Sequence, residues 1–163
     1  EGYLFTSTLE ENLSFGDSSA SKERIREAAK QANLIEDIEG FPDGFNTLVG
    51  ERGITLSGGQ RQRASLARAL LMNSPIILLD DALASVDNKT AAGILSSIRE
   101  QKKRTILMIS HQLSAAVACD RILVLDEGNL VQEGTHHELI GIEGTYKRLW
   151  EREQAVEGLE TVK

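Results

Sequence analysis

Cysteine, basic charge and long apolar runs are all scarce in this sequence, and each scarcity excludes something. Cys119 is the one cysteine among 163 residues, so no disulfide can form within the chain, and this composition fits a reducing compartment. The 18 Lys and Arg are outnumbered by 25 Asp and Glu, and the net charge of −7 argues against non-specific binding to nucleic acid. The longest apolar runs, such as 76–79, fall far short of the roughly 20 residues that a membrane span needs.

What is present is the composition of a soluble globular protein, with 40% hydrophobic and 26% charged residues. The length suffices for one domain with a real core. We expect residues 1–74 to be mainly helical, 75–152 to be α/β, and 153–163 to form a polar tail. The chain opens at Glu1 without Met or a signal-peptide pattern, so we also expect it to be a piece of a longer protein.

Hydrophobic periodicity predicts the order of helices and strands. Helices are expected at 22–33, 58–72, 90–102 and 114–118, and from Thr135 towards Trp150. Strands are expected at 76–79 and 105–110, and 121–126 and 129–133 are expected to form a hairpin. Because continuous apolar strands alternate with helices, the predicted fold class is α/β, with a mostly parallel sheet covered by helices on both faces.

Two carboxylates follow the first apolar strand. Ligand sites of open α/β sheets lie at the carboxyl ends of the strands, where Asp80 and Asp81 stand. Adjacent strand residues point in opposite directions, so we expect different tasks: one carboxylate holds Mg²⁺ through water and the other faces a reacting water. The alternative is a strand that ends in a solvated acidic loop.

Histidine occurs at three positions. His111 follows the next strand at the same edge of the predicted sheet, where it could bind a γ-phosphate or steer water; the alternative is a purely structural histidine. His136 and His137 adjoin the predicted helix cap at Thr135, and we expect both on the surface. With Cys119 distant in the sequence, they form no metal-ligand pattern.

The stretch Leu56-Ser-Gly-Gly-Gln60 predicts an anion site at the start of a helix. Gly58 and Gly59 let backbone N–H groups approach an anion closely, and Ser57 adds a hydroxyl donor. The helix that follows points the positive end of its dipole at the same place. The alternative is an ordinary helix start with a serine N-cap.

The order of these motifs, over nearly the whole chain, resembles that of the nucleotide-binding domain of ABC transporters. Residues 56–60 match the family signature, 76–80 resemble the Walker B strand, 84–87 resemble the D-loop, and His111 resembles the switch histidine. The resemblance implies part of a P-loop NTPase fold, with a helical signature subdomain beside the sheet, and ATP and Mg²⁺ as ligands. The implied roles are nucleotide binding for Ser57, Gly58, Gly59, Gln60 and Asp87, Mg²⁺ binding through water for Asp80, and catalysis for Asp81 and His111.

Finer features are similar to exporters within that family. Thr47–Gly53 resembles the exporter segment that contacts the coupling helices of the membrane domain, and 11–16, 133–139 and 144–149 also look exporter-like. The resemblance implies a place at the cytoplasmic face of the cell membrane. An importer is the alternative, and so is a simple turn at Glu51-Arg52-Gly53.

One departure from the family pattern is an absence. The sequence contains no G-x-x-x-x-G-K-[ST] and no Gly-Lys pair, although a P-loop needs that lysine and glycine backbone to cradle phosphates. In the family the P-loop lies upstream, and Glu1–Phe5 resembles the residues just after the Q-loop glutamine. We therefore expect no ATPase activity and no tight ATP binding from this chain alone.

The other departure is Asp81, where the family usually places the glutamate taken as the general base. A general base contributes typically 10²–10⁴-fold to a rate, and misplacement loses much of that. Because domains of this family pair head to tail, the shorter acid implies a heterodimeric exporter with one weak site, the partner being a second nucleotide-binding domain. Alternatives are an aspartate that works slowly, a regulatory subunit that hydrolyses little, and a soluble ABC-type ATPase acting on DNA or ribosomes, which the negative charge opposes.

Overall fold

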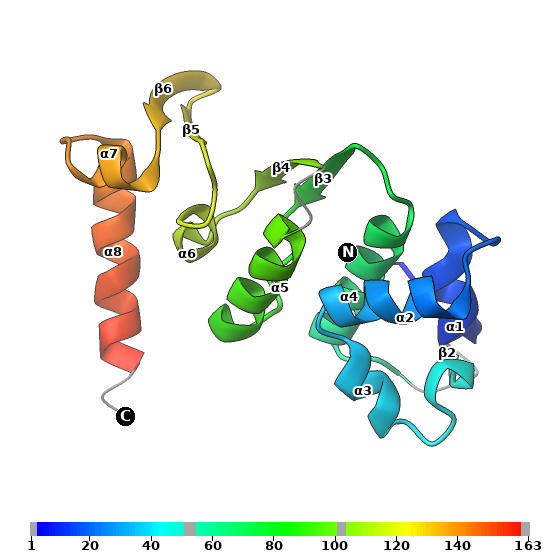
Figure 1. Cartoon of the computed structure of the whole chain (residues 1–163). Coiled ribbons are helices and arrows are strands. Elements are labelled where there is room, and N and C mark those ends of the chain that lie inside the picture. Colours follow the sequence, from blue (N-terminus) through cyan, green and yellow to red (C-terminus); the bar gives the residue numbers. More distant parts are fainter. Residues whose placement is uncertain (1–2, 51–54, 101–103, 161–163) are drawn as a thin grey trace. The chain divides into compact units, whose positions relative to one another are not determined.

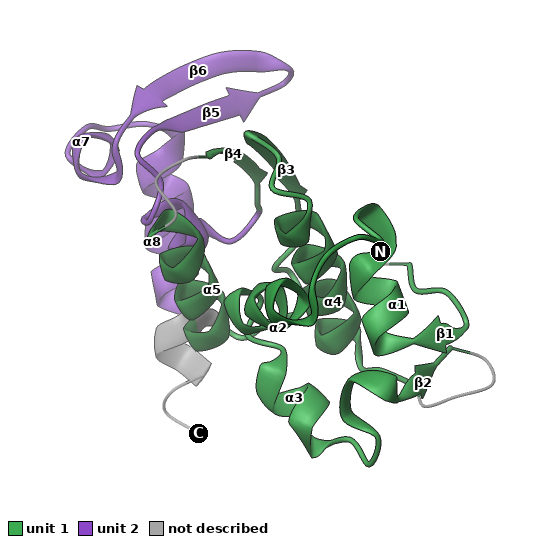
Figure 2. Cartoon of the chain, turned by 45° about the vertical axis from the view of Figure 1, so that its right-hand side comes forward, with its two compact units in different colours: residues 1–110 green, residues 111–163 purple. Residues whose placement is uncertain are grey.

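The computed structural model describes residues 3–50, 55–100 and 104–160. The chain forms two compact units, residues 1–110 and 111–163 (Figure 2), and each is described by itself below. The expected division after residue 74 separates elements by type rather than by compactness, and it stays a prediction.

Unit 1 is helical in its first part and contains a parallel strand pair in its second (Figure 1). Its elements in chain order are β1 (Ser7–Thr8), α1 (Leu9–Leu13), η1 (Ser14–Gly16), α2 (Lys22–Gln31), α3 (Ile35–Gly40), η2 (Gly44–Asn46), β2 (Leu48–Val49), α4 (Gly58–Leu71), β3 (Ile76–Asp80), α5 (Asn88–Glu100) and β4 (Thr105–Ile109). The predicted helices at 22–33 and 58–72 are confirmed to within two residues at each end, and the helix predicted at 90–102 is confirmed as α5, although 101–102 lie outside the described residues. The short pair β1–β2 and helix α3 were not predicted, because their sequences show no clear hydrophobic periodicity.

Helix α4 organises the helical part, because it packs against α2 and α1. Its buried face carries Ala64, Leu66, Ala67, Leu70 and Leu71, and the small alanines let helices approach closely. The buried face of α2 carries Ile25, Ala28 and Ala29, as the periodicity predicted.

The last carbonyls of α4 are capped by two arginines from other elements. Arg24 of α2 donates to the Leu71 carbonyl at 2.9 Å, and Arg104, which precedes β4, donates to the Leu70 carbonyl at 3.0 Å. Cations are favourable at a helix C-terminus because unpaired carbonyls gather there. The end of α4 is thereby tied to both α2 and β4.

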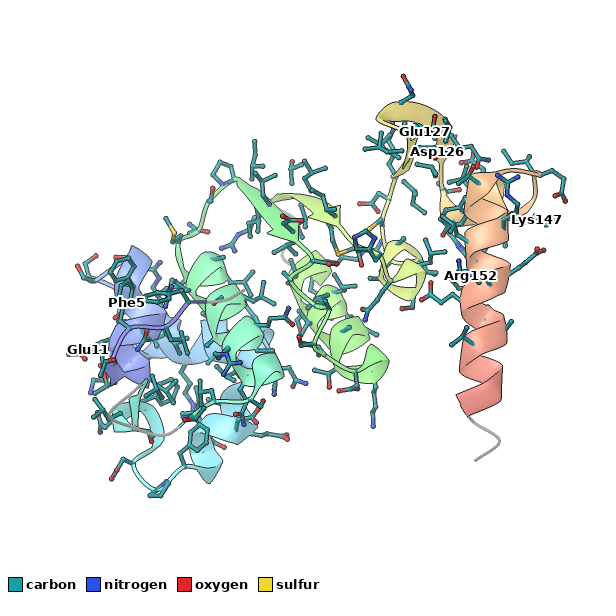
Figure 3. The ribbon with its side chains drawn as sticks, turned by 180° about the vertical axis from the view of Figure 1, so that it is seen from behind. Phe5, Glu11, Asp126, Glu127, Lys147 and Arg152 are labelled. Atoms are coloured by element: carbon teal, nitrogen blue, oxygen red, sulfur yellow. The ribbon has the colours of Figure 1, made fainter. Side chains whose placement is uncertain are left out.

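A second arginine-centred contact holds the N-terminal segment to α4. Arg68 donates to the carbonyls of Asn12 at 2.8 Å and Tyr3 at 3.2 Å, and its guanidinium lies over the rings of Phe5 and Phe15, 5.7 and 5.6 Å from their centroids. Phe5, labelled in Figure 3, follows the described start of the chain. Backbone hydrogen bonds and cation–π contacts thus fix residues 3–15 to the second half of α4.

Strands β3 and β4 pair in parallel, with Ile76 opposite Thr105 and Asp80 opposite Ile109. Ile77 and Leu79 are buried, whereas Leu78 is 70% exposed. On the same face as Ile77 and Leu79, Ile106 and Met108 of β4 are half-buried. The opposite face of the pair is exposed and apolar, and it consists of Ile76, Leu78, Leu107 and Ile109. The α/β fold class is confirmed, but the continuous apolar run overpredicted burial, because this face of the pair is exposed among the described residues.

In its described residues, 111–160, unit 2 consists of a hairpin and three helices. Its elements are α6 (Leu113–Ala116), β5 (Ile122–Asp126), β6 (Asn129–Gly134), α7 (His136–Ile140) and α8 (Thr145–Glu160). The predicted hairpin is confirmed, and Figure 3 labels Asp126 and Glu127 at its turn, where Glu127 and Gly128 both have positive φ. Its core is the buried cluster of Ile122, Val124, Leu139 and Tyr146.

One prediction about the end of the chain is corrected, and the polar tail stays a prediction. The helix that begins at the Thr135 capping box does not continue to Trp150, because it ends at Ile140 and a turn through Gly141 and Gly144 precedes α8. The residues expected as a polar tail from 153 onward continue α8 as far as they are described. Glu153 itself accepts hydrogen bonds from the backbone N–H of Leu113 at 2.8 Å and of Ser114 at 3.3 Å, at the start of α6.

No helix among the described residues is both long and apolar enough to cross a membrane.

Candidate functional site

The start of α4 is a capped helix terminus with reciprocal side-chain bonds. Ser57 Oγ accepts a hydrogen bond from the Gln60 N–H at 3.2 Å, and Gln60 Oε1 accepts one from the Ser57 N–H at 2.9 Å. A hydroxyl that accepts one bond still has its own hydrogen to donate, and Ser57 is exposed. The N–H groups of Gly58 and Gly59 are among those that an α-helix leaves without an intrahelical partner. This terminus can therefore present a hydroxyl and backbone donors to an anion.

The side chain of Gln60 is hydrogen-bonded to Asp37 of α3. Its Nε2 donates to Asp37 Oδ1 at 2.8 Å, while the other carboxylate oxygen of Asp37 accepts from Arg63 Nη1 at 2.7 Å. Both ends of the Gln60 amide are therefore engaged within the chain. In this arrangement Gln60 supports the Ser57 turn, and its direct contact with a nucleotide stays a prediction.

The two carboxylates after β3 have different backbone environments. Asp80 is the last residue of the strand and is exposed, whereas Asp81 lies beyond the strand, is half-buried and has a φ of 49°. The sequence suggested that strand alternation points the two side chains in opposite directions. Strand alternation does not apply to this pair, because the backbone turns at Asp81. A left-handed conformation costs an ordinary L-residue about 1–2 kcal/mol, and Asp is among the residues that tolerate it best.

The left-handed conformation of Asp81 is held by hydrogen bonds on both sides. Its N–H donates to the carbonyl of Ile109 in β4 at 3.0 Å, and its carbonyl accepts from the Ala84 N–H at 3.1 Å. Strain of this kind persists only where the surroundings fix it, and it concentrates at functional sites.

Asp87 closes the loop that follows, residues 81–87 (loop 81–87), by starting α5. Its Oδ1 accepts from the Thr90 N–H at 3.0 Å, and its carbonyl accepts from the Ala91 N–H at 2.9 Å. The backbone N–H of Thr90, followed by the Thr90 side chain, lowers the pKa of the Asp87 carboxyl. Asp87 is thus an ionised, exposed helix cap, and its contact with a nucleotide stays a prediction.

The helix start and loop 81–87 are in direct contact. Gln62 Nε2 donates to the Asp81 carbonyl at 3.3 Å, and Gln62 Oε1 accepts from the Ser85 N–H at 2.8 Å. A Cβ added at Gly59 would lie 2.8 Å from the Ser85 carbonyl oxygen, so only glycine allows this approach. The structure therefore joins the start of α4, with Ser57–Gln60, to loop 81–87 through contacts at Asp81 and Ser85 within unit 1. Asp87 lies at the far end of that loop.

The histidines fall in unit 2. His111 is exposed and is the first residue of that unit, directly after the segment that ends β4. His137 is exposed as expected, whereas His136 is half-buried: its Nδ1 lies 2.9 Å from the Tyr146 hydroxyl and its ring packs edge-on against Trp150. The surface assignment of His136 was wrong, because the turn at Gly141 folds α8 back towards it.

Three comparisons with known proteins bear on this arrangement. The family model described as ABC transporter matches residues 2–84.

The chain belongs to the ABC transporter family.

Similar curated proteins include ABC transporter B family member 6 of Dictyostelium discoideum, 44% identical over 94% of this chain, and the multidrug resistance-like ATP-binding protein MdlA of Buchnera aphidicola, 42% identical over 93%. An ATP-dependent lipid A-core flippase of Photobacterium profundum is 43% identical over 90% of the chain. The matched regions are 23%, 26% and 26% of these relatives, so the chain spans about a quarter of their length.

A solved structure gives the same picture. A bacterial Atm1-family ABC exporter with ATP bound matches with a TM-score of 0.83 and 41% identity, over 91% of this chain and 26% of that one. The chain thus matches part of an exporter-type nucleotide-binding domain with the ABC form of the P-loop NTPase fold, as its motifs predicted.

The acidic residue at the end of β3 can be compared with the ligands that Mg²⁺ prefers. The exposed carboxylate of Asp80 at a strand end is the hard oxygen ligand that Mg²⁺ prefers, and this ion usually takes one or two carboxylates beside substrate phosphates and water. No cluster of three or more His, Cys, Asp or Glu that could hold a metal occurs in the described parts of the chain. The single exposed carboxylate of Asp80 fits a Mg²⁺ site that phosphate oxygens and water complete.

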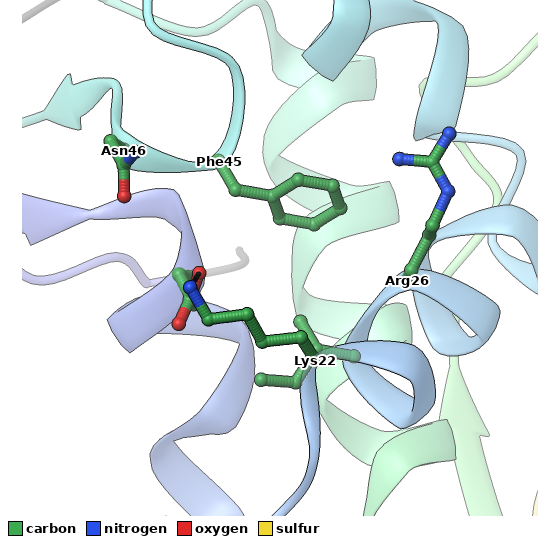
Figure 4. A pocket seen from close by; sticks show the side chains of 6 residues that line it. Lys22, Arg26, Phe45 and Asn46 are labelled. Atoms are coloured by element: carbon green, nitrogen blue, oxygen red, sulfur yellow. Dashed lines mark ion pairs between the residues drawn. The ribbon is translucent and has the colours of Figure 1, made fainter.

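A pocket of about 310 Å³ in unit 1 is a separate feature (Figure 4). Ile25 and Phe45 form its apolar lining, and Lys22 faces Glu10 at 3.9 Å. None of the predicted site residues lines it.

The predicted contact segment for the membrane domain is described only in part. Thr47 and Val49 are buried, Leu48 of β2 is 43% exposed, and Gly50 has a φ of 102°. The remainder of Thr47–Gly53, including Glu51, lies outside the described residues.

Gln62 and Asp37 contact the candidate site and were not predicted from the motifs. Gln62 lies four residues after Gly58 and three after Gly59, so helical spacing places it on their face of α4. That spacing was a usable signal. No sequence pattern pointed to Asp37, because its contacts with α4 depend on how α3 packs.

Proposed function

We propose that this chain is part of the ATP-binding domain of an ABC exporter that couples ATP binding and hydrolysis to export of a substrate across a membrane. The observation that carries the proposal is the start of α4, where Ser57 caps the helix and Gly58 and Gly59 lie against Ser85 of loop 81–87. A capped, glycine-lined helix terminus suits a phosphate, and its contact with the acidic loop joins phosphate binding to carboxylate chemistry.

In the proposed arrangement two nucleotide-binding domains pair head to tail. The Ser57 hydroxyl and the N–H groups of Gly58 and Gly59 donate to phosphate oxygens of ATP held by the second domain. These donors are preorganised by Gln60 and Asp37, so they need little rearrangement when charge develops on the phosphate oxygens.

The carboxylates serve the ATP held by this chain's own domain. Asp80 would hold Mg²⁺ through water, and the bound ion would supply charge neutralisation at the phosphates. Asp81 accepts the proton of the attacking water, and His111 contacts the γ-phosphate. The hydrogen bonds that hold Asp81 at both of its peptide groups support a role that depends on position.

Asp81 is also the reason for proposing that the two ATP sites of the dimer differ. Its carboxylate is one methylene shorter than that of glutamate, so the site it serves is the weaker one of a heterodimer. A regulatory subunit that binds ATP and hydrolyses little is the second candidate, and the same residue favours it.

Further partners follow from the exporter assignment. The segment Thr47–Gly53 contacts the coupling helices of a membrane domain, at the cytoplasmic face of the cell membrane; the exposed side chain of Leu48 supports this contact. The chain has no P-loop sequence, so it hydrolyses no ATP by itself.

The test is ATP hydrolysis by the full-length protein, measured alone and with candidate partner subunits at matched concentrations. We expect activity only with the partner, and none from residues 1–163. Full activity of the protein alone would make it a homodimer in which Asp81 suffices as base. Substantial ATP binding with negligible turnover in every combination would favour the regulatory subunit.

A further inference from the structure

We propose that Gln62 is a positioning residue that locks Asp81 to the start of α4, so that the two half-sites carried by this chain are joined through one side-chain amide. The inference deepens the proposed function and rests on it. It concerns a residue outside the Ser57–Gln60 turn and outside the acidic pair.

The amide of Gln62 bonds two separate points of loop 81–87. Its Nε2 donates to the carbonyl of Asp81 at 3.3 Å, and its Oε1 accepts from the N–H of Ser85 at 2.8 Å. Gln62 is half-buried, and both ends of its amide are used. Only a side chain with one donor and one acceptor at this length makes both bonds.

These bonds fix the direction in which the Asp81 side chain leaves the backbone. The N–H of Asp81 is held by the carbonyl of Ile109, and its carbonyl is held by Gln62 together with the N–H of Ala84. Because the peptide groups on both sides of the Asp81 Cα are held, the direction of its Cα–Cβ bond is set. The left-handed φ of 49° at Asp81 makes this restraint more important, since an unrestrained loop would relax to a commoner conformation.

The backbones of α4 and loop 81–87 are close enough for the Gln62 side chain to reach the loop. Gly59 lies so near the loop that an added Cβ would come within 2.8 Å of the Ser85 carbonyl oxygen. Gly59 and Gln62 are three residues apart on α4 and therefore share a face. Contact at Gly59 and bonding at Gln62 hold Ser85 at two adjacent places.

The consequence for the proposed reaction is a link between opposite sites. The Ser57 turn acts on ATP held by the partner domain, whereas Asp81 acts on ATP held by its own domain. Gln62 thus connects the phosphate contacts of one site to the base of the other. Loss of Gln62 leaves ATP binding nearly intact and lowers the hydrolysis rate, because it moves the base rather than a phosphate ligand.

The experiment uses the full-length protein in its active assembly, with the general-base glutamate of the partner domain replaced by glutamine so that the remaining turnover reports the Asp81 site. It compares Gln62→Met and Gln62→Glu with the same assembly carrying unaltered Gln62. Methionine keeps the length and removes both bonds, whereas glutamate keeps an acceptor for Ser85 and removes the donor to Asp81. Ser65→Ala is the control, since it lies on the same helix and its hydroxyl has no hydrogen-bond partner among the described residues. The readouts are kcat and KM for ATP, and hydrogen exchange of the peptide that contains Ser85.

We expect both Gln62 variants to lower kcat roughly tenfold with KM changed less than twofold, and Gln62→Met to speed exchange at Ser85. In an Asp81→Asn background the Gln62→Met change should lower kcat no further, because the base through which it acts is gone. An unchanged kcat, a rise in KM alone, equal effects in both backgrounds, or unchanged exchange at Ser85 would overturn the proposal. If the unaltered assembly hydrolyses no ATP, the proposed function itself fails and the catalytic role of Gln62 falls with it, a result distinct from the others.

Discussion

Ser57 and Gln60 hold each other at the start of α4, each accepting a hydrogen bond from the other's backbone N–H, at 3.2 and 2.9 Å. The pair satisfies two donors that the helix terminus would otherwise leave open, and it fixes the serine hydroxyl beside Gly58 and Gly59. Stability and the proposed anion contact therefore depend on the same side chain.

Replacing Ser57 with alanine should affect both properties. Loss of the cap is expected to lower the free energy of unfolding by about 1 kcal/mol. Loss of the hydroxyl donor should lower ATP hydrolysis by the full-length assembly roughly tenfold, the effect of one hydrogen bond to a charged group. Thermal unfolding and steady-state ATPase assays measure the two effects.

Ser21→Ala is the matched control for Ser57→Ala. Ser21 caps α2 in the same way, accepting from the Arg24 N–H at 3.4 Å. The Ser21→Ala variant should lose a similar free energy of unfolding, and its assembly should keep the ATPase rate of the unaltered protein. Equal losses of activity in both variants would show that the Ser57 effect comes from folding alone.

Asp37→Ala should loosen the Ser57 turn from a distance. Asp37 accepts from Gln60 and Arg63, whose side chain is only 15% exposed, so the variant leaves a partly buried guanidinium without its carboxylate. We expect the free energy of unfolding to fall by about 1.5–3 kcal/mol. The control is Glu39→Ala on the same helix, since the Glu39–Arg26 pair is solvent-exposed and should contribute less than about 1 kcal/mol. Chemical denaturation of both variants decides whether Asp37 is the stronger anchor.

Asp81→Glu should change turnover and stability in opposite directions. The longer side chain reaches further towards a water nucleophile, so the full-length assembly should hydrolyse ATP faster. The left-handed backbone suits glutamate less than aspartate, so the free energy of unfolding should fall by about 1 kcal/mol. Steady-state turnover that stays at the level of the unaltered assembly would contradict the assignment of Asp81 to a weak site.

His136 should make unit 2 sensitive to mild acid. Burial first, and the charge of His137 second, lower the pKa of His136 below its ordinary value of about 6.5. The unfolded chain then binds the proton more readily, so the contribution of His136 is fully present above pH 6.5 and is lost as pH falls towards the lowered pKa.

Thermal unfolding at pH 5.5 and 7.5 measures this effect. The melting temperature should fall more between these values in the unaltered chain than in His136→Phe, which cannot be protonated. His137→Asn is the control, and it should retain most of the pH dependence because burial, the larger cause, remains. An equal fall in all three proteins would assign the dependence to other groups.

Local sequence predicted those features that depend on neighbours in the chain. The Ser57 cap, the apolar face of α2 and the Glu127-Gly128 turn all follow from residues within one helical turn or one hairpin, and the structure has each of them. Features made by distant residues were not predictable in the same way. Gln62 meets partners 19 and 23 positions away, and its role depends on how close α4 comes to loop 81–87.

Two other differences have equally specific causes. The capping box at Thr135 marked where a helix begins, but no comparable pattern marked its end, so α7 and α8 were read as one helix. The departure of Asp81 from strand geometry was hidden because aspartate is common both at strand ends and in left-handed turns.

Helix α4 has a mechanical consequence that follows from its two attachments. Its 14 residues span about 21 Å, a rod that is stiff along its axis. At one end Gly59 and Gln62 bear on loop 81–87, and near the other Arg68 grips the backbone of Tyr3 and Asn12. An axial displacement of residues 3–15 would therefore reach loop 81–87 along the length of α4.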